Sequence, residues 1–71
     1  MNIKKIREKI YKLKNNKLKI RINLGRNKYE YLEGYINDIY PNLFTINTNK
    51  GLKSFSYSDV IIKNVIISKF S

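Results

Sequence analysis

The stretch Lys17–Tyr40, KLKIRINLGRNKYEYLEGYINDIY, decides the fold of this chain. From Leu18 to Leu24, apolar and polar residues alternate strictly, which is the pattern of a strand with one buried face and one solvated face. Gly25-Arg26-Asn27 supplies residue types that reverse the chain in a tight turn. A second, longer strand is predicted from about residue 28 to residue 40. Together these segments predict an antiparallel hairpin.

The apolar face of this hairpin sets how its strands pair. Because Ile20 and Leu32 are expected to face the same core, they should lie opposite each other. On the outer face, this register places Lys17 across from Tyr35, Lys19 across from Glu33 and Arg21 across from Tyr31. On the inner face, Ile36 and Tyr40 should continue the row of Leu32. Gly34 also falls on this side, where a missing side chain permits a bend or bulge of the kind that closes small barrels.

Three further short strands are expected downstream, separated by turn signals. The turn at 40–43 contains Pro41 and Asn42, and the next hairpin turn is Thr48-Asn49-Lys50-Gly51. The expected segments are a third strand at 43–47, a fourth at 52–57, a short helical turn at Ser58-Asp59, and a fifth strand at 60–67.

An amphipathic helix is predicted upstream, over residues 3–14. Ile3, Ile6, Ile10 and Leu13 recur at intervals of three, four and three residues, so they form one helical stripe. Asn2 is a suitable N-cap. A helix of this length does not persist alone in water, so the stripe must dock on the strands.

The chain is therefore predicted to be a single mainly β domain over residues 1–71. Residues 1–15 hold the N-terminal helix, and residues 17–70 form a five-stranded antiparallel small barrel of the SH3-like or Sm-like kind, with the helix covering one open end. The expected barrel core is Leu18, Ile20, Ile22, Leu32, Ile36, Phe44, Ile46, Val60 and Val65.

Positive charge is concentrated at one end of the sequence. The chain has a net charge of +10, and its first 28 residues carry eleven basic side chains against one acid, Glu8. The remaining residues balance to zero. A field of one sign attracts phosphate polymers, anionic membranes or an acidic protein partner. The alternative is a basic face that is only solvated.

The outer face of the first hairpin is the candidate binding surface. Aromatic rings stack on unpaired bases while neighbouring cations meet phosphates. The alternative is an exposed strand on which these side chains bind nothing. The candidate residues for an anionic partner are Lys17, Lys19, Arg21, Tyr31 and Tyr35, with Arg26 and Lys28 at the hairpin tip.

Composition argues against catalysis and against a membrane partner. The chain has no His and no Cys, so it lacks the usual general base, thiolate nucleophile and imidazole ligand. We expect no enzymatic activity, no metal and no cofactor. The helix stripe is narrow, lacks Trp and Phe, and is needed by the small core. No signal peptide or membrane-spanning run is visible, so a soluble, cytoplasmic protein is expected.

Three ordered motifs resemble the Veg family of Gram-positive bacteria. They are Gly25-Arg26-Asn27-Lys28, the segment 34–46 (GYINDIYPNLFTI) and the segment 54–61 (SFSYSDVI). This chain departs from the family pattern at Leu24, where a first glycine is usual, and at Ile62, where Thr is usual. The resemblance implies a helix with an Sm-like or SH3-like barrel, no known catalysis, and no established binding residues to carry over.

The resemblance also implies a small regulator that stimulates biofilm formation by relieving transcriptional repression. Two classes of function stay open at this point. One is a regulator that acts through a regulatory protein partner, and the other is a basic module that binds RNA or single-stranded DNA. A homodimer is compatible with both.

Overall fold

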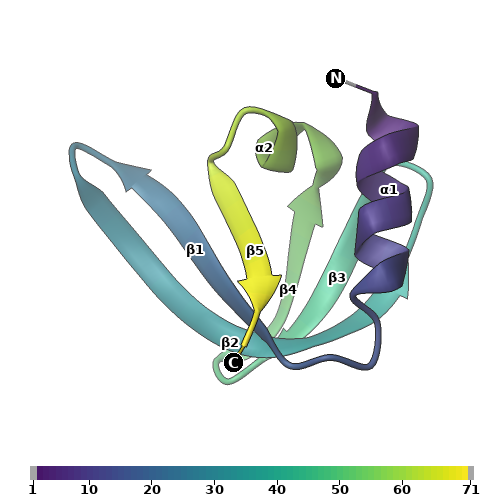
Figure 1. The fold of residues 1–71 in the computed structure, drawn as a ribbon. Coiled ribbons are helices and arrows are strands. Elements are labelled where there is room, and N and C mark those ends of the chain that lie inside the picture. The colour runs from purple at the N-terminus through teal and green to yellow at the C-terminus, as the bar shows by residue number, and fades with distance from the viewer. Residues whose placement is uncertain (1, 71) are drawn as a thin grey trace.

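The computed structural model describes residues 2–70, in which two helices and five strands follow one another along the chain (Figure 1). The strands form one antiparallel sheet in the order β4-β3-β2-β1-β5, so β4 and β5 are its edges. The predicted mainly β fold of a helix and five antiparallel strands is confirmed. The elements are α1 (Ile3–Lys12), β1 (Leu18–Gly25), β2 (Lys28–Ile39), β3 (Leu43–Thr48), β4 (Gly51–Ser56), α2 (Tyr57–Ile61) and β5 (Val65–Lys69).

The register of the first hairpin is the one that the apolar alternation predicts. Ile20 pairs with Leu32, Lys19 with Glu33, and Arg21 with Tyr31. Pairing stops at Leu18 and Gly34, so the predicted Lys17–Tyr35 pair does not form. Lys17 instead makes an ion pair with Glu33, with 3.6 Å between Nζ and Oε1.

A bulge interrupts β2 closer to its end than the predicted bend. Between the pairs Ile36–Ile46 and Ile39–Phe44, two residues of β2 stand against one of β3. The extra residue shifts the alternation by one position. Tyr40 therefore points outward and is 47% exposed, so its predicted inward orientation is wrong.

Gly34 is buried, as predicted, but it lies in regular pairing with both neighbouring strands. A Cβ atom there would clash with the backbone carbonyl oxygen of Asn47 and lie 2.8 Å from Cα of Thr48. The missing side chain thus allows β3 to approach β2 closely. Of the two alternatives predicted for Gly34, a bend or a bulge, the bulge is wrong, because it lies between Ile36 and Ile39 instead.

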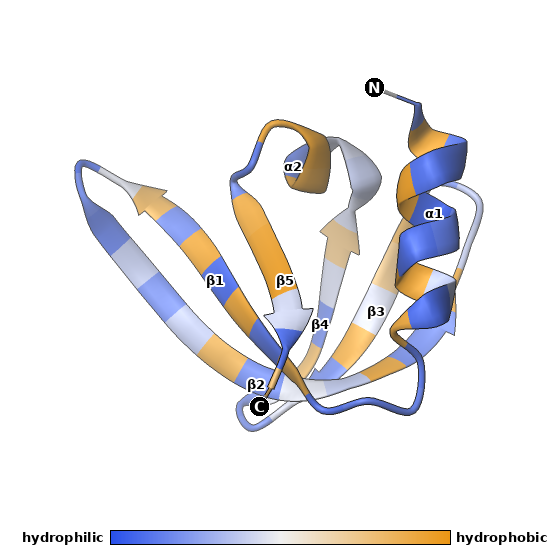
Figure 2. Cartoon of the chain, viewed as in Figure 1, coloured by the Kyte–Doolittle hydropathy of each residue, from blue (hydrophilic) through white to orange (hydrophobic). Residues whose placement is uncertain are grey.

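Helix α1 ends at Lys12, two residues before the predicted end, with Leu13 as its C-cap. At its start, the Asn2 side chain accepts a 2.9 Å hydrogen bond from the amide of Lys4, which confirms the predicted cap. Ile6 and Ile10 are buried, so the apolar stripe docks on the rest of the protein. Figure 2 shows apolar bands on α1 and β5.

The prediction for strands four and five needs correction. The Ser56 hydroxyl accepts a 3.2 Å hydrogen bond from the amide of Asp59 and caps α2, so the fourth strand ends before Tyr57. Val60 belongs to this helix and is half-buried. The fifth strand therefore starts at Val65, not at Val60, and it runs to Lys69.

The core centres on Phe44, whose ring centroid lies 5.8 Å from that of Phe55 and 5.4 Å from that of Tyr57. Two predicted core residues, Ile22 and Val60, are only partly buried. The buried apolar residues are Ile6, Ile10, Leu18, Ile20, Leu32, Ile36, Phe44, Ile46, Phe55, Tyr57 and Val65.

Candidate nucleic-acid interface

The outer face of the sheet collects cations and aromatic rings from three adjacent strands. Paired residues project to the same side of a sheet, so Arg21 shares this face with Tyr31 of β2 and Ile66 of β5. In the same way, Lys19 shares it with Glu33 and Ser68. We define the basic aromatic face as Lys17, Lys19, Arg21, Tyr29, Tyr31, Glu33 and Phe70.

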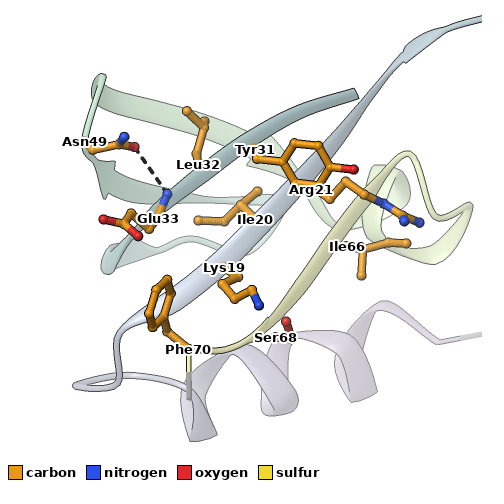
Figure 3. A pocket seen from close by; sticks show the side chains of 10 residues that line it. All are labelled: Lys19, Ile20, Arg21, Tyr31, Leu32, Glu33, Asn49, Ile66, Ser68 and Phe70. Atoms are coloured by element: carbon orange, nitrogen blue, oxygen red, sulfur yellow. Dashed lines mark hydrogen bonds between the residues drawn. The ribbon is translucent and has the colours of Figure 1, made fainter. Parts of the chain in front are cut away.

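An open groove of about 570 Å³ crosses this face (Figure 3). Tyr31 from β2 and Phe70, just after β5, both line it, with Lys19 and Arg21 of β1 between these strands. The groove thus offers aromatic rings on both sides of a row of cations. Its full lining is Lys19, Ile20, Arg21, Tyr31, Leu32, Glu33, Asn49, Ile66, Ser68 and Phe70.

The cations lie against rings of the same face. The guanidinium carbon of Arg21 is 4.8 Å from the ring centroid of Tyr29. The Nζ atoms of Lys17 and Lys19 are 4.7 and 5.7 Å from the ring centroid of Phe70. At such distances, a ring and a cation attract each other by about 0.5–1 kcal/mol at an exposed site. These contacts restrain the side chains before any ligand arrives.

Glu33 is the one carboxylate on the face, and its backbone is fixed by Asn49. The amide of Glu33 donates to Oδ1 of Asn49 at 3.2 Å, and the amide of Asn49 donates to the carbonyl oxygen of Glu33 at 2.9 Å. The Glu33 carboxylate is paired with Lys17. With Lys17, Lys19 and Arg21 present, the face keeps an excess of positive charge.

The structure brings only part of the predicted candidate surface together. Lys19, Arg21 and Tyr31 line the groove, and Lys17 lies at its edge against Phe70. Arg26 and Lys28 belong to the projecting tip of the β1–β2 hairpin and do not line the groove (Figure 1). Tyr35 is exposed but lies opposite Asn47 of β3, outside the groove.

Phe70 is the main groove residue that the sequence prediction missed. Its amide donates a 2.8 Å hydrogen bond to the carbonyl oxygen of Lys17, which places its ring beside β1. A signal was present, because Ile66, Ser68 and Phe70 continue a period of two past the predicted strand end. Tyr29 and Asn49 were also missed.

Neither a metal centre nor a membrane-spanning helix is found among the residues that the structure describes. Within residues 2–70, no three His, Cys, Asp or Glu side chains gather as a metal site. No helix in the same range is long and apolar enough to cross a bilayer.

The fold defines this chain as a small mainly β protein, with an N-terminal helix followed by five antiparallel strands in one sheet. The family model described as "Biofilm formation stimulator VEG" matches residues 1–68, and the chain belongs to that family. This finding confirms the resemblance seen in the three sequence motifs, and it assigns the chain to biofilm stimulation. A search of curated proteins found no match.

Proposed function

We propose that the chain stimulates biofilm formation as a non-catalytic cytoplasmic regulator that binds single-stranded nucleic acid through its basic aromatic face. Binding would act on gene expression by modulating transcriptional repression. The observation that carries this proposal is the groove in which Tyr31 and Phe70 flank Lys19 and Arg21.

Exposed rings favour a single strand over a duplex. Tyr31 is 67% exposed and Phe70 is 45% exposed, so both can offer ring surface to a ligand. Unpaired bases stack on aromatic side chains, whereas the bases of a duplex are already stacked on each other. The rings can thus add base stacking to the electrostatic attraction between the cations and the phosphates.

The strand order sets the geometry of such a complex. Tyr31 and Phe70 lie on either side of β1, two strand spacings or about 10 Å apart across the sheet. They are also offset along β1, because Tyr31 lies opposite Arg21 whereas Phe70 bonds to Lys17, four residues earlier. Between them, Lys19 and Arg21 are placed to meet the phosphates of a single strand that runs from one ring to the other. This arrangement would contact the phosphates and the flat faces of the bases. It offers few groups for recognising particular base edges, so a weak sequence preference is expected.

An acidic regulatory protein is the competing partner. The same positive field would steer and orient an acidic surface. A protein carboxylate would pair with the cations but would leave the exposed ring surfaces of Tyr31 and Phe70 without a specific role. The rings therefore favour nucleic acid.

Fluorescence anisotropy with labelled oligo(dT) and oligo(U) tests the proposal. The face variant reverses three charges of the basic aromatic face (Lys17→Glu, Lys19→Glu, Arg21→Glu). The matched helix variant reverses the charges of three exposed lysines of α1 (Lys4→Glu, Lys5→Glu, Lys12→Glu). Both variants have the same net charge. We expect the face variant to lose at least about a hundredfold in affinity, and the helix variant to lose far less.

Salt and strandedness complete the test. For a single strand, the affinity should fall with salt on a log-log slope of about 0.7 per phosphate neutralised. A duplex of the same length should bind more weakly than the single strand. Absence of a complex at low salt, or equal losses in the two triple variants, would reject the proposal and leave the acidic protein partner as the explanation.

A further inference from the structure

A second groove lies between α1 and β5, and it shares Ile66 with the groove on the basic aromatic face. Its volume is about 370 Å³. Eight of its ten lining residues are apolar, and they come from α1 and its C-cap Leu13, from α2 and from β5. The other two are the exposed lysines Lys9 and Lys63, and neither Glu8 nor Asp59 lines the groove. The groove is therefore apolar with a basic border.

One wall of this groove carries an unpaired strand edge. The amide of Asn23 donates to the carbonyl oxygen of Asn64, and that of Phe70 donates to Lys17, both at 2.8 Å. In an antiparallel pair, hydrogen-bonded positions alternate with positions whose polar groups face the other way. Residues 66 and 68 therefore bond to β1, whereas the backbone groups of Val65, Ile67 and Lys69 face away from it.

Among residues 2–70, the backbone edge of β5 that faces away from β1 has no hydrogen-bonding partner. No strand of the sheet pairs with β5 on the side opposite β1. None of the turn, loop and cap hydrogen bonds uses the backbone groups of Val65, Ile67 or Lys69. Unpaired backbone donors and acceptors on a strand edge are a template for an added strand.

We propose that the α1–β5 groove binds an extended acidic peptide segment of a partner protein, which adds to β5 as a sixth strand. This inference is independent of the nucleic-acid proposal because it uses the backbone edge of β5 that faces away from β1, although the two grooves share Ile66. The peptide backbone would pair with Val65, Ile67 and Lys69. A partner bound here would leave the basic aromatic face open.

The sequence of the segment follows from the alternation of a strand. Peptide residues opposite Val65 and Ile67 project to the same side as these two side chains, which is the side of the apolar groove. Apolar residues suit those positions. The remaining positions suit carboxylates, because Lys9 and Lys63 border the groove and the whole chain carries a charge of +10.

The probe is an acetylated, amidated peptide in which valine alternates with aspartate. Amide hydrogen exchange of the full chain, measured by NMR, should slow at least about tenfold at Val65, Ile67 and Lys69 when this peptide is added. The amides of Ile66 and Ser68, which already bond to β1, should change little. A peptide of the same composition with its valines clustered at one end, and a lysine version of the alternating peptide, should bind far more weakly.

Two sets of variants separate backbone pairing from charge. Lys69→Pro removes an edge amide without breaking a bond to β1 and should weaken peptide binding several-fold relative to Lys69→Ala. Reversing both border lysines (Lys9→Glu, Lys63→Glu) should lower affinity at least about tenfold. The matched double variant Lys12→Glu, Lys53→Glu has the same net charge and should bind nearly as well as the parent chain.

Several results would overturn the inference. They are the absence of peptide binding, binding without new protection at the three edge amides, and equal losses in the two double variants. Protection of these amides without peptide, rising with protein concentration, would show that a second copy of the chain covers the edge instead.

Discussion

Lys17 and Phe70 contact each other twice although they lie near opposite ends of the sequence. The Lys17 ammonium is 4.7 Å from the centroid of the Phe70 ring, and the Phe70 amide donates a 2.8 Å hydrogen bond to the Lys17 carbonyl oxygen. The start of β1 and the end of β5 are thereby joined. The ring is held at the groove before a ligand binds, which lowers the entropic cost of stacking.

Phe70→Ala should weaken binding of single-stranded oligonucleotides by about 1–3 kcal/mol, the usual cost of losing one stacked base, with little change in the free energy of unfolding. Anisotropy titrations and urea denaturation measure the two quantities. Tyr11→Ala is the control, since Tyr11 is 53% exposed on α1, outside the groove. Equal affinities for the two variants would show that Phe70 does not stack on bases.

Glu33→Gln should raise the affinity for oligonucleotides several-fold. The change removes the carboxylate that pairs with Lys17 at 3.6 Å, while the hydrogen bonds to Asn49 use backbone atoms of residue 33 and remain. More positive charge then faces the phosphates, and the salt slope should steepen. Glu8→Gln adds the same charge on α1 as a control. A gain no larger than that of Glu8→Gln would contradict a local role for the face.

Gly34→Ala should destabilise the fold by more than about 2 kcal/mol because the new methyl group would meet the backbone of Asn47 and Thr48. Gly51→Ala has open space around its Cβ and is strained only by its φ of 103°, so it should cost less, about 1 kcal/mol. Urea denaturation gives both values. If the urea midpoint of Gly34→Ala were close to that of the parent chain, the backbones of β2 and β3 would have to lie farther apart at residue 34 than the structure places them.

Tyr57 should make stability pH-dependent only in alkaline solution. Burial raises the pKa of its hydroxyl above the ordinary tyrosine value of 10.0, although the positive charge of Arg7 opposes the shift. The hydroxyl also donates a 2.6 Å hydrogen bond to the carbonyl oxygen of Tyr40. Because the folded state holds this proton more tightly, its contribution is complete below pH 10 and is lost as pH rises further.

Tyr57→Phe should therefore cost about 1 kcal/mol at neutral pH and flatten the loss of stability above pH 10. Tyr11→Phe on the exposed surface of α1 should do neither. Denaturation midpoints from pH 7 to 11 provide the comparison. An unchanged alkaline profile in Tyr57→Phe would place the titrating group elsewhere.

The first hairpin could be predicted from the sequence because its alternation is unbroken. Ile20 and Leu32 have to share one face, and that requirement fixes the Lys19–Glu33 and Arg21–Tyr31 pairs. The prediction failed for Tyr40 because a bulge between Ile36 and Ile39 carries no distinctive residue pattern. Alternation alone cannot show where one extra residue enters a strand.

The second half of the site could not be predicted because the segment after Tyr57 is ambiguous. Val60 reads as the start of a strand, but the Ser56 cap and the buried Tyr57 ring turn this segment into α2. Short apolar runs fit a helix or a strand equally well, and tertiary contacts decide between them. Because the fifth strand was expected at 60–67, Phe70 lay beyond its predicted end and was not assigned to the binding face.

Complementation in cells tests the central claim most directly, because the claim links one face of the molecule to the role of its family. A strain lacking the gene should form less biofilm, and biofilm mass should be measured after it receives each triple variant at matched protein abundance. The account predicts that the helix variant (Lys4→Glu, Lys5→Glu, Lys12→Glu) restores biofilm and that the face variant (Lys17→Glu, Lys19→Glu, Arg21→Glu) does not. Full restoration by the face variant would contradict the account.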